Sequence, residues 1–107
     1  MIGRAFVFLT LLAARPSSPS HATAGTLVLK NASWDAVQVD VRLGPSTDCA
    51  ANRVVGTRTL NRDQWWTIVT NDVICWRREA VPGDVAHGWT TWTGLRVATG
   101  TKQEVVL

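Results

Sequence analysis

The sequence predicts an all-β protein: a small antiparallel β-sandwich of six or seven short strands with one disulfide, or, as second choice, a partly closed small β-barrel. Apolar and polar residues alternate with period two, most clearly from Val37 to Leu43. Turn residues recur roughly every 8 to 12 positions. No long stretch shows the three- and four-residue apolar spacing of an amphipathic helix. These three observations favour short strands throughout.

The first half of the domain contains the clearest strands. In order, we expect a strand around Leu27 and Leu29, a turn at Asn31 to Ser33, a strand from Val37 to Leu43, a break at Gly44 to Asp48, and strands over Arg53 to Leu60 and Gln64 to Thr70. Between Val37 and Leu43 every odd position is apolar and every even position is polar. This strand is therefore expected to bury one face and expose the other.

The second half is expected to form two hairpins. Asn71-Asp72 separates two β-branched and aromatic runs, so Gln64 to Thr70 and Val73 to Glu79 should pair around a two-residue turn. The remaining expected elements are a break at Pro82 to Asp84, a short extended piece over Gly88 to Thr93, and a closing hairpin of Leu95 to Ala98 with Glu104 to Leu107.

The N-terminus has the pattern of a cleaved secretory signal peptide, predicted over residues 1–24. Arg4 precedes an apolar run from Ala5 to Ala14, and Ala22-Thr23-Ala24 forms a small-residue cleavage site. The apolar run is about half the ~20 residues of a spanning helix, so no integral membrane segment is expected after cleavage. Residues 25–107 are then a single all-β domain, exported to the periplasm or the extracellular space.

Two cysteines, Cys49 and Cys75, are expected to form one disulfide. Both lie in the exported part, which meets an oxidising compartment. Neither belongs to a C-x-x-C pair or has a histidine nearby in sequence, so a redox or nucleophilic role is disfavoured. Closing this loop would stabilise a small core.

Charge excludes nucleic acid as an expected partner. Of 11 Lys and Arg residues, Arg4 and Arg15 leave with the signal, so nine remain against eight Asp and Glu. Nearly balanced charge provides no electrostatic attraction for phosphate backbones or anionic membranes.

All six tryptophans lie in the exported part, and they have two interpretations. Trp and Arg side chains can cover a small core efficiently, or exposed indoles can form a platform for a sugar ring or a partner protein. The predicted hairpin places Trp66 opposite Arg77, and its face with Trp65, Val69, Ile74 and Trp76 is expected to be the core. The candidate ligand-binding residues are Trp66, Arg77, Trp89 and Trp92.

No catalytic residue, metal site or cofactor is predicted. His87 is the only exported histidine, and neither Ser33 nor Ser46 lies in a nucleophile turn. Asp84 and His87 are too few ligands for an ordinary metal site. The predicted function is a non-enzymatic binding or interaction domain with an unknown protein or glycan ligand. The alternatives are a carbohydrate-binding module with exposed tryptophans and, third, a small secreted hydrolase or hydrolase inhibitor.

Overall fold

The computed structural model describes residues 24–107. The expected signal peptide, apart from Ala24, lies outside the described residues. Within residues 24–107 we find no helix of the length and apolarity needed to cross a membrane.

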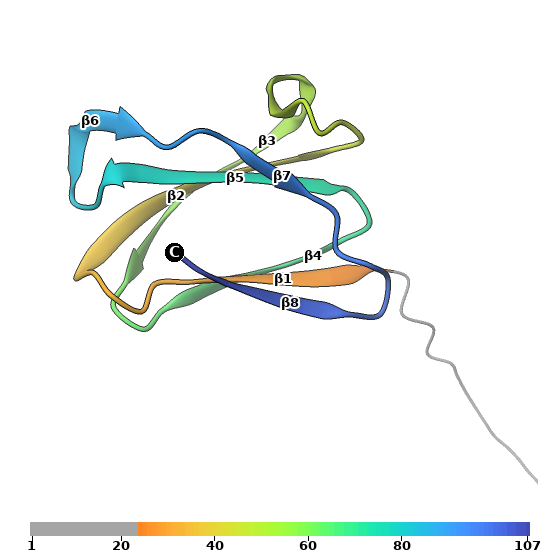
Figure 1. The fold of residues 1–107 in the computed structure, drawn as a ribbon, viewed down its shortest axis with the longest axis horizontal. Coiled ribbons are helices and arrows are strands. Elements are labelled where there is room, and N and C mark those ends of the chain that lie inside the picture. The colour runs from red at the N-terminus through yellow and green to blue at the C-terminus, as the bar shows by residue number, and fades with distance from the viewer. Residues whose placement is uncertain (1–23) are drawn as a thin grey trace, which may run out of the picture.

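Eight strands in two sheets make up the described part of the chain (Figure 1). They are β1 (Gly25–Lys30), β2 (Ala36–Gly44), β3 (Arg53–Asn61), β4 (Trp65–Thr70), β5 (Val73–Val81), β6 (Asp84–Trp89), β7 (Thr93–Leu95) and β8 (Lys102–Val106). A short 3-10 helix, η3 (Cys49–Ala51), lies between β2 and β3. The smaller sheet has the order β4-β1-β8; the larger has the order β3-β2-β5-β6, with β7 also paired to β5.

The core lies between the two sheets, and the period-two alternation produces it. In β2, Val37, Val39 and Val41 are fully buried, as are Leu27 and Leu29 of β1. The other buried members of this cluster are Leu60, Trp66, Ile68, Ile74 and Val97. Because alternate side chains of a strand point to opposite faces, each sheet presents one apolar face to the other. The predicted β-sandwich is confirmed.

One strand pair departs from the antiparallel arrangement, and the expected closing hairpin does not form. β8 runs parallel to β1, whereas β7 pairs antiparallel with β5. The chain leaves β7 in the larger sheet and crosses to the smaller sheet before β8 begins (Figure 1). Leu95 to Ala98 and Glu104 to Leu107 therefore cannot pair with each other.

The hairpin predicted at Asn71-Asp72 is also wrong. β4 pairs with β1 and β5 pairs with β2, so these two residues connect the sheets. Asn-Asp lacks the glycine that most favours a tight hairpin turn. A true hairpin follows at Pro82-Gly83, where Val81 pairs with Asp84. Gly83 has a φ of 88°, and Pro followed by such a Gly is typical of a type II turn.

This change of strand partners reverses the buried face of β4. Trp66 is only 4% exposed and packs in the core with Ile68 and Ile74, whereas Trp65 is 60% exposed. The prediction that Trp65 is buried and Trp66 partly exposed is therefore wrong. In a two-residue hairpin Val69 would share a face with Ile74; because the chain crosses between sheets, Ile68 takes that place.

The predicted disulfide is confirmed and holds η3 against β5. Cys49 and Cys75 have Cα atoms 5.6 Å apart. Val73 and Trp92 pack around the bond in a second, smaller apolar cluster. A Cβ at Gly94 would lie 3.3 Å from Cys49 Sγ, so the β7 backbone passes close over the disulfide.

Reduction of this disulfide should lower the free energy of unfolding by about 3.5 kcal/mol, the chain-entropy value for a separation of 26 residues. For a domain of this size the melting temperature should fall by about 15 °C. Calorimetry with and without reductant measures the change. The Cys49→Ser/Cys75→Ser double variant should melt like the reduced protein and should not respond to reductant. Equal melting temperatures for oxidised and reduced protein would contradict the prediction.

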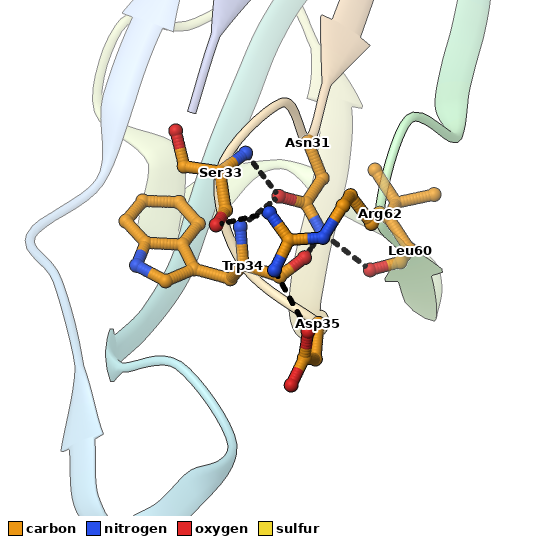
Figure 2. A network of polar contacts seen from close by, with 6 residues as sticks. All are labelled: Asn31, Ser33, Trp34, Asp35, Leu60 and Arg62. Carbon is orange, nitrogen blue, oxygen red and sulfur yellow. Dashed lines mark hydrogen bonds and ion pairs between the residues drawn. The ribbon is translucent and has the colours of Figure 1, made fainter.

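Asn31, at the end of β1, ties the two sheets together (Figure 2). Its Nδ2 donates hydrogen bonds to the carbonyl oxygens of Trp34 and Leu60, both at 2.9 Å. Its Oδ1 accepts from the backbone N–H groups of Ser33 and Trp34. The residue is fully buried. Although Asn31-Ala32-Ser33 matches the glycosylation acceptor pattern, this asparagine is a structural residue in the folded domain.

Candidate functional site

Arginine guanidinium groups cover four of the tryptophan rings in the described residues. Arg58 lies 4.4 Å from the ring centroid of Trp66, and Arg78 lies 4.7 Å from that of Trp34. The expected stacking of Trp66 on Arg77 is wrong, because β4 and β5 are not neighbouring strands. Trp66 is buried beneath Arg58, so it presents no free ring to a ligand.

The other three predicted site residues come together on the larger sheet. Arg77 lies 4.4 Å from the ring centroid of Trp92 and 4.9 Å from that of Trp89, and Arg42 lies 5.0 Å from Trp92. We call Arg42, Trp92, Arg77 and Trp89 the Arg–Trp stack. Each contact of this kind contributes about 0.5 to 2 kcal/mol.

The side chains of the Arg–Trp stack are already engaged in contacts within the domain. Arg77 forms an ion pair with Asp40 at 3.1 Å, and Arg42 Nη1 donates to the Ala50 carbonyl at 3.3 Å. Trp92 packs against the disulfide cluster. The stack therefore reinforces the outer face of the larger sheet and leaves few groups free for a ligand.

Asp84 and His87 lie close together at the tip of the β5–β6 hairpin. His87 Nδ1 is 2.8 Å from Asp84 Oδ2, and both side chains are largely exposed. Among residues 24–107 there is no group of three or more His, Cys, Asp or Glu side chains arranged to hold a metal ion. The contact is an ordinary surface pair.

A more open site lies on the outer face of the smaller sheet, around the exposed indole of Trp65. Strand pairing places Lys30 beside Trp65, and Val28 between Thr67 and Glu104. These side chains surround a hollow of about 340 Å³. Its lining consists of Thr26, Val28, Lys30, Trp65, Thr67, Lys102 and Glu104, which we call the first hollow.

A second hollow, of about 380 Å³, also has Trp65 in its wall. Its lining is Arg58, Thr59, Leu60, Asp63, Gln64 and Trp65. These residues come from the end of β3, the turn that follows it and the start of β4. Because β4 is an edge strand of its sheet, Trp65 lies between the outer face of that sheet and the side of the sandwich near β3.

The charged groups of the two hollows are free of ion pairs in the described part of the chain, although the Arg58 guanidinium already stacks on Trp66. In the described part of the chain, Lys30, Lys102 and Glu104 form no ion pair, and neither do Arg58 and Asp63. The ion pairs found there join other residues. Regular strands carry the first hollow, so the backbone positions from which its side chains project are fixed before any ligand arrives.

Residue-by-residue reasoning missed this site because it assigned Trp65 to the core. The signal was present in β1, where Leu27 and Leu29 are buried and the alternating Thr26, Val28 and Lys30 form the other face. The neighbours of that face could be identified only once β4 and β8 were known to flank β1.

The fold and the site define a small, disulfide-linked β-sandwich with an exposed aromatic residue that borders two hollows of mixed polar and apolar lining. Comparison with protein families, curated proteins and solved structures finds no match.

Proposed function

We propose that this chain is a small exported, non-enzymatic binding domain that holds its ligand against Trp65. The carrying observation is the indole itself, which is 60% exposed on a regular strand and borders both hollows. An exposed aromatic ring leaves apolar surface in contact with water. A ligand that covers this surface gains hydrophobic free energy. The polar side chains in the two mixed linings can then orient the ligand.

The polar groups around Trp65 favour a sugar ring over a protein surface. Lys30, Lys102 and Glu104 lie in the first hollow. The centres of protein interfaces are depleted in Lys and Glu. A sugar hydroxyl both donates and accepts hydrogen bonds, so an ammonium donor near a carboxylate acceptor suits it. The apolar face of a sugar ring can lie on the indole at the same time.

Export is supported by two features of different kinds. The N-terminal pattern is that of a secretory signal, and the domain contains a disulfide, which persists in oxidising compartments. We therefore propose that the domain works in the periplasm or outside the cell.

A partner protein is the second candidate ligand, and β3 favours it. This nine-residue strand has a neighbour on one side only and exposes Val54 and Val55. An unpaired strand edge can accept a strand from another chain. However, its register shifts opposite Val41 and Arg42, and such bulges protect edges from pairing. The Trp65 site is therefore the better candidate.

Trp65→Ala should abolish or greatly weaken glycan binding while leaving the protein folded. We would screen the wild-type protein on a glycan array and measure the affinity of the best binder by calorimetry. Loss of a central aromatic anchor should weaken binding by at least about tenfold. Val85→Ala, which trims an exposed apolar side chain of β6, is the matched control and should bind normally. Undiminished affinity of folded Trp65→Ala would contradict the proposal.

A further inference from the structure

Resting on the proposed sugar-binding function, we infer that the ligand is a linear, largely uncharged oligosaccharide that crosses Trp65, with one sugar ring in each hollow. A single terminal sugar would need only one hollow.

Trp65 is the only residue common to both linings. The first hollow extends from it over β1 and β8, and the second extends toward the end of β3. A ligand that contacts the indole therefore borders both hollows. Each volume, about 340 and about 380 Å³, is at the lower end of the range for small-molecule sites. One short unit in each hollow fits these sizes better than one large ligand in either.

Both hollows combine hydrogen-bond donors with acceptors. In the second hollow, Arg58 supplies donors and Asp63 a carboxylate acceptor. The side-chain oxygen Oε1 of Gln64 already accepts the Asn61 backbone N–H, so the side-chain amide nitrogen is the group that remains for a ligand. In the first hollow, Thr26 and Thr67 add hydroxyl groups to the charged side chains. Two linings of the same chemistry indicate two chemically similar ligand units.

The charges disfavour a polyanionic chain. The first hollow contains Lys30, Lys102 and Glu104, and the second contains Arg58 and Asp63. Three cations therefore accompany two anions across the whole track. A polyanion needs a consistent excess of positive charge along its path. A chain of neutral sugars can hydrogen-bond to both the cationic and the anionic side chains, and it brings no charge that either of them would repel.

The test measures binding of oligomers of one to six units of glucose (β-1,4-linked) and of N-acetylglucosamine (β-1,4-linked), with a heparin fragment as the polyanionic probe. For at least one neutral series, affinity should rise by about tenfold or more from one unit to three and then level off. The heparin fragment should bind less tightly than that series. Tighter heparin binding that depends on Trp65 would overturn the assignment of an uncharged chain.

Variants in each hollow show whether the ligand occupies one hollow or both. Glu104→Gln changes the first hollow, and Asp63→Gly changes the second while tolerating the φ of 66° at that position. Each should weaken trimer binding by about fivefold or more, and the effects should multiply in the double variant. Asp35→Ala, which removes an exposed carboxylate outside both hollows, is the control and should bind normally.

Failure of this inference and failure of the proposed function give different results. If one- and three-unit ligands bind equally and only one hollow variant matters, while Trp65→Ala still abolishes binding, the two-hollow track is wrong and the binding site stands. If neither these oligomers nor any glycan on the array binds in a manner that depends on Trp65, the sugar-binding function is wrong, and this inference is wrong with it.

Discussion

Trp66→Ala should lower the free energy of unfolding by about 3 to 5 kcal/mol, the range for deleting a large core aromatic. The indole is 4% exposed and packs with Leu29, Ile68 and other members of the main core. Its removal leaves a cavity between the sheets and also removes the ring face on which the Arg58 guanidinium stacks. Urea denaturation followed by circular dichroism measures the loss. We expect a strongly destabilised protein or one that fails to fold.

The neighbouring substitution Trp65→Ala is the internal comparison and should cost less than about 1 kcal/mol, because its indole is mostly in water. The two variants remove the same side chain from adjacent positions of β4, so composition and strand propensity are matched. Equal, large losses at both positions would contradict the reversed face of β4. They would also remove the support for Trp65 as an exposed binding residue.

Asn31→Ala should cost about 4 kcal/mol, the second large effect. Four hydrogen bonds are lost, and the buried carbonyl of Leu60 loses the bond it receives from this amide. Each typical bond contributes about 1 kcal/mol, and an unsatisfied buried group adds about 1 to 3 kcal/mol. The melting temperature should fall by about 15 °C or more. Differential scanning calorimetry measures this fall.

Two controls distinguish the buried amide from the rest of its turn. Ser33→Ala removes the glycosylation pattern and keeps every bond of the Asn31 side chain, because Ser33 contributes only its backbone N–H to that network. Asn61→Ala removes an exposed asparagine from β3. Both should change stability by about 0.5 kcal/mol or less. If Ser33→Ala destabilised the protein as much as Asn31→Ala, the loss of stability could not be assigned to the hydrogen bonds of the Asn31 side chain.

The local pattern of the sequence was enough to predict the strands from β1 to β5, but it misplaced β6, expected over Gly88 to Thr93, and β7, expected over Leu95 to Ala98. The buried residues of β2 are the odd-numbered valines that alternate with polar neighbours, and the turn residues after Leu43 mark its end. Cys49 and Cys75 paired as their number and the expected export predicted. Alternation and turn chemistry are properties of a few consecutive residues, and tertiary contacts did not override them here.

Strand partners were decided only by the tertiary structure. Nothing in Asn71-Asp72 distinguishes a turn between neighbours from a connection between sheets, and that choice reverses which face of β4 is buried. Placing β1 between β4 and β8 then brought Lys30, Lys102 and Glu104 around Trp65. The sequence by itself determined most of the strands, the disulfide and the abundance of indoles. The pairing of distant strands, which depends on how two complete sheets pack, decided which indole reaches solvent and which polar groups surround it.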